Sequence, residues 1–374
     1  MTEIHGTASG RFARVKDAFA ANFAQDLELG ARFTVLVEGE TVVDLMGGHA
    51  DRAKTQAWDE RTLAPVFSTG KAVMALMMAR LVDRGLLDYE ATVASYWPAF
   101  GQAGKEFITV GQLLSHQGGL SGFAEPQDPS IWYDTERLLR TLEAQAPLWP
   151  PGTGSGYHPV TIGALAAELF RRLDGRSMGM ALHEDLCRPH GLDMWLGLPE
   201  SEYGRVAGIR KPTAAPFLGD IDDIKRKAFL DAGSSPTQAG LDAWRRLAMP
   251  STHLHATAPA LARLMGVLAN GGRLGDEQAL SGLTLAKATR ERVYGPDKVL
   301  PFTLSWAAGF LRNKGLNIYG PGELTVGHSG WGGSCAFADP EARVSGAYVM
   351  NRQSPHLIGD PRPVGLIDTL YAAL

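Results

Sequence analysis

Apolar residues follow two different spacings near the start of the sequence. In residues 9–27 they recur every three or four positions, for example at Phe12, Val15 and Phe19, which is the spacing of an amphipathic helix. In residues 33–45 two runs rich in β-branched residues instead flank a short Glu-Gly-Glu turn, and this pattern predicts a β-hairpin. The chain is therefore expected to begin with a helix followed by two antiparallel strands.

The rest of the chain divides into a helical stretch and a strand-rich stretch. Helical spacing dominates residues 68–271, where loops rich in proline and glycine interrupt it. Short, turn-bounded runs rich in small and β-branched residues return after residue 301 and predict strands. Residues 366–374 have apolar positions that predict a closing helix.

The simplest assembly joins the early hairpin and the late strands into one antiparallel sheet covered by the terminal helices. We therefore expect an α+β architecture, with an α/β domain formed by residues 1–66 and 290–374. Residues 67–289 are expected to form a mostly helical domain, and the active site to lie between the two. Strands do not alternate with helices along the sequence, which disfavours a doubly wound nucleotide-binding fold.

Composition and charge exclude several classes of partner. The 36 Lys and Arg residues are outnumbered by 40 Asp and Glu residues, for a formal net charge of −4, so nucleic acid is not an expected partner. The N-terminus lacks a continuous apolar segment and no apolar run approaches the roughly 20 residues that span a bilayer. Cys187 and Cys335 fit neither a disulfide framework nor a metal-ligand spacing. We expect two buried thiols in a cytoplasmic protein with no membrane partner.

Ser68 and Lys71 stand at the head of a second helical pattern, whose apolar positions begin at Met74. A serine at this place is a good N-cap. Because residues three apart share one helix face, the Lys71 amine also reaches the Ser68 hydroxyl. A helix N-terminus supplies free backbone N–H groups that stabilise a developing oxyanion, and burial lowers a lysine pKa enough to make the amine a base. A lone S-x-x-K is weak evidence, so a cap and a nucleophile both remain open here.

A second serine lies in the pattern G-x-S-x-G, from Gly175 to Gly179, with Ser177 at its centre. In α/β-hydrolases this pattern forms a turn from strand to helix that carries the nucleophile. Here helical spacing precedes and follows it, so Gly175 is expected to end one helix and Ser177 to cap the next. The context argues against Ser177 as the nucleophile.

Two further stretches each have an ordinary structural interpretation when taken alone. Tyr157 follows a loop rich in proline and glycine, where a tyrosine usually packs and makes one hydrogen bond. Residues 325–334, TVGHSGWGGS, leave one predicted strand and enter the next through a glycine-rich turn. Small residues in such a turn let a ligand approach the backbone closely.

Taken together and in this order, these stretches resemble the penicillin-recognising serine hydrolases. That group includes class C β-lactamases, serine D,D-peptidases and the family VIII carboxylesterases, and its pattern is S-x-x-K, then Y-x-N, then K-T-G. Ser68 and Lys71 match the first motif, and Tyr157 matches the tyrosine of the second. The resemblance implies a β-lactamase/D,D-peptidase-like fold, an antiparallel sheet flanked by terminal helices with an inserted helical domain.

Other positions show where the chain departs from the pattern and which branch it resembles. Pro159 replaces the asparagine of Y-x-N, and residues 328–330, His-Ser-Gly, replace K-T-G. The following Trp-Gly-Gly at 331–333 resembles the W-G-G of the esterase branch, and LLSHQGGLSGF at 113–123 also resembles a stretch of these relatives. An additional G-x-S-x-G that is not the nucleophile is common in that branch.

The resemblance implies acyl transfer through a covalent acyl-Ser68, with Lys71 and Tyr157 forming the base system. Free lysine and tyrosine have pKa values near ~10.4 and ~10, so the activating role belongs to the coupled pair. By resemblance Tyr157 is favoured for the direct proton transfer, and the oxyanion donors are the backbone N–H groups of Ser68 and Trp331. No cofactor and no metal are expected. The implied substrate-binding residues are His328, Ser329, Gly330, Trp331, Gly332 and Gly333.

The departures favour a neutral ester with a small acyl group as substrate. Pro159 cannot bind an acylamide as asparagine does, and His328 is mostly neutral at pH 7, unlike the lysine of K-T-G. The prediction is a serine carboxylesterase for short-chain esters. The alternatives are a β-lactamase, D,D-peptidase or acyltransferase that uses the same site, and a non-catalytic binding protein that merely becomes acylated. The oligomeric state is left open.

The remaining histidines are expected to be structural. His116 lies between apolar residues and a Gly-Gly turn, where a hydrogen-bonded structural histidine is the usual case. His253 and His255 form an H-x-H with no third ligand at a suitable spacing, so a metal site is rejected. Three tryptophans could line an apolar pocket, although core packing is the commoner use of each: Trp132, Trp149 and Trp306.

Overall fold

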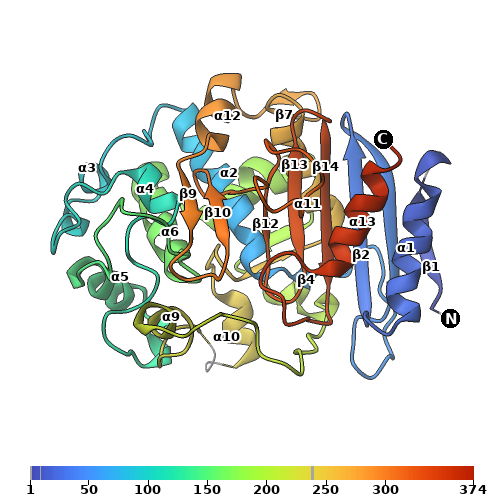
Figure 1. Cartoon of the computed structure of the whole chain (residues 1–374), viewed down its shortest axis with the longest axis horizontal. Coiled ribbons are helices and arrows are strands. Elements are labelled where there is room, and N and C mark those ends of the chain that lie inside the picture. Colours follow the sequence, from blue (N-terminus) through green and yellow to red (C-terminus); the bar gives the residue numbers. More distant parts are fainter. Residues whose placement is uncertain (1, 9, 237–239) are drawn as a thin grey trace.

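The computed structural model describes residues 2–8, 10–236 and 240–374, and these contain one large antiparallel sheet. Its nine strands run in the order β1-β3-β2-β14-β13-β12-β11-β10-β9 (Figure 1). The predicted hairpin is confirmed as β2 and β3, and β2 also pairs with the late strand β14. The strands are β1 (Ile4–Ala8), β2 (Gly30–Val37), β3 (Glu40–Gly48), β9 (Val293–Pro296), β10 (Thr303–Trp306), β11 (Leu311–Arg312), β12 (Val326–Ser329), β13 (Cys335–Asp339) and β14 (Val344–Met350).

Helices cover both faces of the sheet. The terminal helices α1 (Ala13–Ala24) and α13 (Pro361–Tyr371) pack on one face, and α11 (Ala258–Ala269) packs on the other (Figure 1). Alternate residues of β14 follow this division, since Tyr348 belongs to the core under the terminal helices and Val349 to the core under α11. Side chains of a strand alternate between the two faces of its sheet. When both faces are buried, most positions of the strand are therefore apolar.

Helix α11 lies within residues 67–289, the segment assigned to the helical domain, but it packs against the large sheet. Several other helices of that segment lie beside the sheet, on the left of Figure 1, namely α3, α4, α5, α6 and α9. The division of the chain into domains at these boundaries stays a prediction. The other helices are α2 (Gly70–Asp83), α3 (Val93–Tyr96), α4 (Val110–Leu114), α5 (Thr135–Ala144), α6 (Thr161–Asp174), α7 (Met178–Leu182), α8 (Arg188–His190), α9 (Asp223–Phe229), α10 (Leu241–Arg246) and α12 (Gly282–Thr289).

Two small sheets complete the described structure. The strands β4 (Ala64–Pro65), β6 (Leu254–Ala256) and β5 (Met194–Leu196) form a three-stranded sheet, and β7 (Arg273–Leu274) pairs with β8 (Glu277–Gln278). Strand β4 comes directly before the segment that carries Ser68, and β6 comes directly after the segment that contacts Lys71. The three-stranded sheet therefore brings together two parts of the chain that lie far apart in the sequence.

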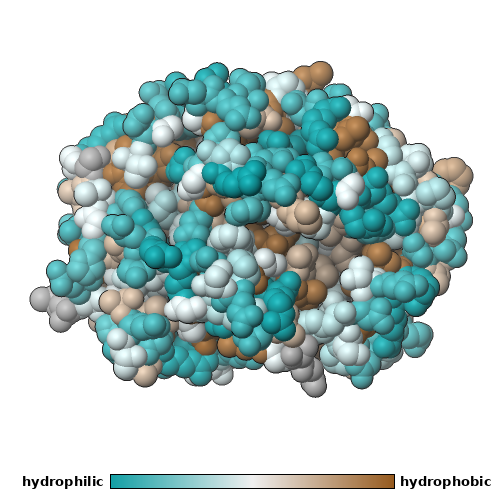
Figure 2. Space-filling model, turned by 180° about the vertical axis from the view of Figure 1, so that it is seen from behind, coloured by the Kyte–Doolittle hydropathy of each residue, from teal (hydrophilic) through white to brown (hydrophobic). Residues whose placement is uncertain are grey.

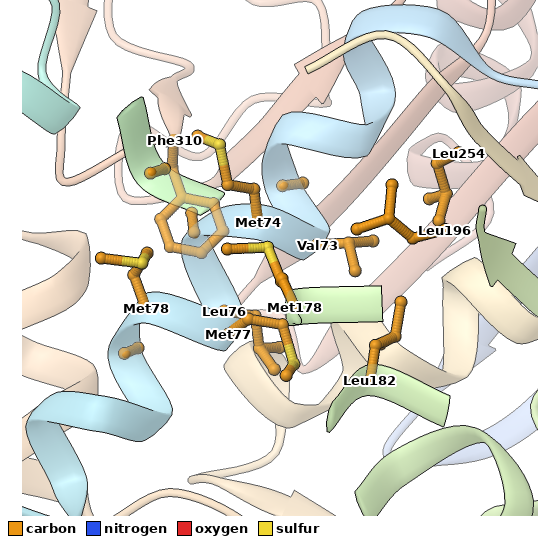
Figure 3. Close-up of a cluster of buried hydrophobic side chains, with 14 of the residues drawn as sticks. Val73, Met74, Leu76, Met77, Met78, Met178, Leu182, Leu196, Leu254 and Phe310 are labelled. Atoms are coloured by element: carbon orange, nitrogen blue, oxygen red, sulfur yellow. The ribbon is translucent and has the colours of Figure 1, made fainter. Parts of the chain in front are cut away.

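Helix α2 is buried on nearly all sides. Met74, Met77 and Met78 belong to a cluster that includes Met178 of α7 and Phe310 (Figure 3). A helix that is apolar around its whole circumference packs in the interior of a protein, and a side chain of this size stabilises the fold by about 1.5–3 kcal/mol when fully buried. The head of α2 is therefore held in a fixed position, which suits a catalytic serine and lysine.

The face of the molecule that Figure 2 shows is mainly polar. Seen from behind, hydrophilic residues cover most of the molecule, and apolar residues gather in a hollow near the centre of the view (Figure 2). Among the helices of the described residues, none combines the length and the apolar character needed to cross a bilayer.

Candidate active site

Ser68 lies in a short 3₁₀ turn, Phe67–Thr69, immediately before α2. The N-cap position of α2 is occupied by Thr69, whose side chain accepts no capping hydrogen bond. Of the two interpretations of Ser68 that the sequence left open, the N-cap is therefore wrong, because the hydroxyl is bonded to other side chains. Phe67 has φ of 48°, a left-handed conformation that is costly for a side chain of this size and that is found at functional sites.

The Lys71 amine is fully buried beside Ser68. Its Nζ lies 3.0 Å from Ser68 Oγ, 2.7 Å from the Pro159 carbonyl oxygen and 3.0 Å from the Ser251 carbonyl oxygen. Burial lowers the pKa of Lys71 well below its ordinary value. A neutral amine has two hydrogens and one lone pair, so the two carbonyls accept the hydrogens and the lone pair is left for the Ser68 hydroxyl.

Tyr157 completes the contacts of the Ser68 hydroxyl, because its phenol donates to Ser68 Oγ at 2.8 Å. Burial raises the pKa of Tyr157 above its usual value, an effect that the hydrogen bond to Ser68 partly opposes. The ring stacks on Trp306 with centroids 5.8 Å apart and an angle of 7° between the planes. The structure thus brings together Ser68, Lys71 and Tyr157, as the first two motifs predicted.

A carboxylate that was not singled out from the sequence holds Tyr157 in place. Asp297 Oδ1 accepts from the backbone N–H of Tyr157 at 2.9 Å, and also from the N–H groups of Val299 and Leu300. Its Oδ2 accepts from the Ser155 hydroxyl at 2.8 Å. Nothing in the local sequence around Asp297 indicates this role, since Ser155 and Tyr157 lie more than a hundred residues away from it in the chain.

The glycine-rich turn after β12 packs closely against the segment that carries Ser68. A Cβ on Gly330 would lie 2.2 Å from the Val66 carbonyl oxygen, so a larger residue would force the two segments apart. The Ser334 hydroxyl donates to that same carbonyl at 2.9 Å and lies 3.0 Å from the Thr69 hydroxyl. Within the described part of the chain, the backbone N–H of Ser68 and that of Trp331 donate to no acceptor.

His328 is buried on the sheet side of the site. Its Nδ1 lies 2.8 Å from the carbonyl oxygen of Ser329, while no partner for Nε2 is found among the described residues. Burial, together with the positive charge that Lys71 would carry, lowers the pKa of His328 to about 3. The ring is therefore uncharged at neutral pH. Ser329 bonds with the Tyr319 hydroxyl at 2.7 Å.

A cavity of about 430 Å³ opens in front of Ser68. Its walls are mostly apolar and come from both the sheet and the helical segments, with Phe67, Val160, Leu218, Phe229, Trp306 and Trp331 among the lining residues. Pro159, His328 and Ser329 also line it. A cavity of this size and character binds a small molecule and excludes much of the water around it.

Of the three tryptophans considered from the sequence, Trp306 lines the cavity. Trp132 is buried and donates to the Gly233 carbonyl, and Trp149 packs against His158. Trp244, which was not singled out, lines the cavity and packs against Phe67. Trp244 lies in a short, mostly polar helix, and nothing in the sequence there distinguishes a tryptophan that lines a cavity from one that packs on the surface.

Ser177 takes the structural role predicted for it. It is exposed, and its hydroxyl caps α7 by accepting from the Met180 N–H at 3.2 Å. Gly175 ends α6 with φ of 87°. Neither Lys71 nor Tyr157 is a partner of Ser177, so the geometry that surrounds Ser68 is not repeated here.

The other histidines lie behind the site or beside it. His116 is buried, and its ring packs against Tyr157 and Trp306 at centroid distances of 5.0 and 4.5 Å. Its Nδ1 accepts from the His158 N–H at 3.2 Å, and burial lowers its pKa well below the usual range. His253 lines the cavity and His255 is buried. Among the described residues no three His, Cys, Asp or Glu side chains are grouped so as to hold a metal ion.

Comparison with known proteins places these features in a family. The Beta-lactamase family model matches residues 19–368. The esterase/beta-lactamase LipL of Mycobacterium tuberculosis is 36% identical over 369 residues, which cover 93% of this chain and 83% of LipL. The crystal structure of a penicillin-binding protein homolog from Caulobacter crescentus is 55% identical with a TM-score of 0.98, and that of a family VIII carboxylesterase is 40% identical with a TM-score of 0.93. Each of these two structures covers 100% of both chains.

Proposed function

The chain belongs to the beta-lactamase family, and from this premise we propose that it is a serine carboxylesterase that hydrolyses short-chain carboxylic esters through an acyl-Ser68 intermediate. The observation that carries the proposal is the double contact of the Ser68 hydroxyl, 3.0 Å from Lys71 Nζ and 2.8 Å from the Tyr157 hydroxyl. A serine is a poor nucleophile until an adjacent base takes its proton. Here Lys71 is at hydrogen-bond distance from Ser68, and Ser68 itself lines an apolar cavity.

Acylation begins when Ser68 Oγ bonds to the ester carbonyl carbon and its proton passes to Lys71. The π electrons of the carbonyl move to its oxygen, and the backbone N–H groups of Ser68 and Trp331 stabilise that oxyanion. When the intermediate collapses, the alkoxide leaves and takes a proton from the Lys71–Tyr157 pair, which gives the free alcohol. Water then attacks the acyl carbon and gives one proton to the Lys71–Tyr157 pair. As the bond between the acyl carbon and Ser68 Oγ breaks, that proton passes to Oγ, and the carboxylic acid is released with the oxygen and the other proton of the water.

The two pKa directions support Lys71 as the immediate proton acceptor. Burial favours the neutral amine of Lys71, whereas burial raises the pKa of Tyr157 and so disfavours a tyrosinate. The resemblance to known families had implied Tyr157 for this step. Tyr157 is then suited to pass a proton toward the leaving alkoxide, and the pair titrates as a unit.

The walls of the cavity support a neutral ester as substrate. The uncharged ring of His328 offers no cation to a substrate carboxylate, and Pro159 presents an apolar ring where an asparagine would offer an amide. The carbonyl of Pro159 is already occupied by Lys71. Because the name of LipL joins an esterase with a beta-lactamase activity, slow hydrolysis of lactams is included in the proposal as a side activity.

A panel of p-nitrophenyl esters from acetate to octanoate tests the proposal directly, with the wild type compared with Ser68→Ala and Ser177→Ala. We expect hydrolysis that is fastest for the short acyl chains, a loss of at least ~10³-fold in Ser68→Ala, and less than about a twofold change in Ser177→Ala. Both variants replace a serine hydroxyl with hydrogen, so they form a matched pair.

Three outcomes would contradict the proposal. Activity that survives in Ser68→Ala would remove Ser68 from the chemistry. Faster turnover of a chromogenic cephalosporin than of every ester would favour a β-lactamase. An acyl adduct on Ser68 that intact-mass spectrometry detects without any turnover would favour a binding protein.

A further inference from the structure

Arg362, at the start of α13, lies behind the turn that carries Trp331. Its side chain is buried, with 5% of the residue exposed. One guanidinium nitrogen, Nη2, donates at 2.6 Å to the carbonyl oxygen of Gly332, the residue that follows Trp331. Nη1 donates to the backbone carbonyls of Leu27 and Arg352 at 3.2 and 2.9 Å. A single side chain therefore connects the turn to the segment before β2 and to the segment after β14.

Two buried carboxylates hold this guanidinium in place. Asp360 accepts from Nε at 3.1 Å and from Nη2 at 2.8 Å, and Glu28 accepts from Nη1 at 3.0 Å. The Tyr348 hydroxyl donates to Glu28, and the Ser354 hydroxyl donates to Asp360 at 2.5 Å. Asp360 is itself the N-cap of α13. A forked, planar group with this many partners has one orientation, which is the property that separates arginine from lysine.

Three of the residues in the turn, Gly330, Gly332 and Gly333, have no side chain that could fix its position. Gly332 and Gly333 have φ of 94° and 126°, in a region that favours glycine. A Cβ on Gly333 would lie 2.5 Å from Arg362 Nη2, and a Cβ on Gly332 would lie 2.4 Å from Gln353 Cγ. On the opposite side Gly330 packs against the Val66 carbonyl. The turn is thus held between the Arg362 network and the segment that leads to Ser68.

We propose that Arg362 is a positioning residue for the acyl-transfer reaction, which aims the backbone N–H of Trp331 at the oxyanion by fixing the neighbouring Gly332 carbonyl. The inference rests on the proposed function, since it assumes that this N–H is an oxyanion donor. Donors of this kind act on charge that develops in the transition state, and a displacement of about 1 Å costs on the order of 10²-fold in rate. A loosened turn should therefore lower kcat and leave KM nearly unchanged.

The test compares Arg362→Lys with Arg32→Lys. Arg32 is also buried, with 6% exposed, and it binds both oxygens of Asp44 and the Glu60 carbonyl without contacting the turn. Both variants keep the positive charge but lose the forked guanidinium group, so both should have a lower melting temperature than the wild type. With p-nitrophenyl acetate, well below either melting temperature, we expect kcat to fall about 10- to 100-fold in Arg362→Lys, with KM within about twofold. The kcat of Arg32→Lys should stay close to that of the wild type.

A second readout separates this inference from the proposed function. A fluorophosphonate phosphonylates an activated serine as Ser68 Oγ displaces fluoride, so its labelling rate reports on the nucleophile and the oxyanion donors without any turnover. We expect the rate to fall in Arg362→Lys and not in Arg32→Lys. If Arg362→Lys does not fold, Asp360→Asn loosens the same guanidinium and should lower both rates in the same direction by a smaller factor.

Equal kcat values and equal labelling rates in Arg362→Lys and Arg32→Lys would overturn the inference and leave the proposed function standing. A rise in KM with an unchanged kcat would also overturn it, because the turn would then serve binding. A wild type that neither hydrolyses esters nor is labelled at Ser68 would overturn the proposed function, and the inference with it.

Discussion

The two walls of the active-site cavity are built from different kinds of group. The helical wall presents the side chains of Ser68 and Tyr157, and Lys71 is buried behind Ser68; the Ser68 hydroxyl is hydrogen-bonded to both of the others. The sheet wall presents Ser329, Trp331 and the uncharged ring of His328. In the first wall the proposed chemistry belongs to side chains, and in the second the proposed oxyanion donor is a backbone N–H, that of Trp331.

This difference suggests that the helical wall carries out the reaction and that the sheet wall selects the substrate. The departures of this chain from the family pattern, at Pro159 and at residues 328–330, concern the groups that face a substrate. Ser68, Lys71 and Tyr157 are the residue types of the family pattern, and none of the hydrogen bonds of these side chains involves His328. We therefore expect changes in the helical wall to affect the rate for every substrate, and changes at His328 to affect the choice among substrates.

The largest effect is expected from Lys71→Met, which removes the buried base while keeping an unbranched side chain of similar length. General base catalysis contributes about 10²–10⁴-fold, so kcat/KM for short esters should fall by that factor. Lys105→Met is the matched control, because Lys105 is also buried and donates to three backbone carbonyls far from Ser68. Steady-state kinetics at a temperature where both variants are folded distinguishes them. A similar loss in both would show that Lys71 acts only through stability.

A smaller effect is expected from Asp297→Asn. The amide keeps the shape of the carboxylate but weakens its bonds to the Tyr157 N–H and the Ser155 hydroxyl. Hydrogen bonds to charged groups contribute about 1.5–3 kcal/mol, and a shift of Tyr157 should lower kcat roughly 10-fold. Asp339→Asn is the control, since Asp339 is buried and accepts two backbone N–H bonds in another loop. An unchanged kcat in Asp297→Asn would remove it as a support of Tyr157.

The smallest effect is expected from His328→Lys, which places a cation on the sheet wall. The ratio of kcat/KM for an anionic cephalosporin to that for a neutral ester should rise about 5-fold, the equivalent of ~1 kcal/mol. His328→Gln removes the ring without adding charge and should leave the ratio near that of the wild type. The same ratio in both variants would show that charge on this wall does not select the substrate.

The local patterns of the sequence predicted the elements that depend on neighbouring residues. The hairpin of β2 and β3, helices α1, α2 and α13, and the helix-to-helix turn around Ser177 all lie where spacing and turn residues placed them. The reach of Lys71 to Ser68 followed from their separation by three residues. The sequence could not decide whether Ser68 caps the helix, because α2 is preceded by a 3₁₀ turn in which tertiary contacts determine what the Ser68 hydroxyl bonds to.

The amino-acid sequence by itself determined which residues are able to react and in what order they occur along the chain. Only the tertiary structure decided which groups surround them, such as the carbonyls of Pro159 and Ser251 on Lys71 and the carboxylate of Asp297 on Tyr157. A backbone carbonyl is present at every residue and therefore leaves no mark in the sequence. The pKa of Lys71 depends on burial, and burial is a property of the packed chain, so the fold determines whether this lysine is a base or a surface cation.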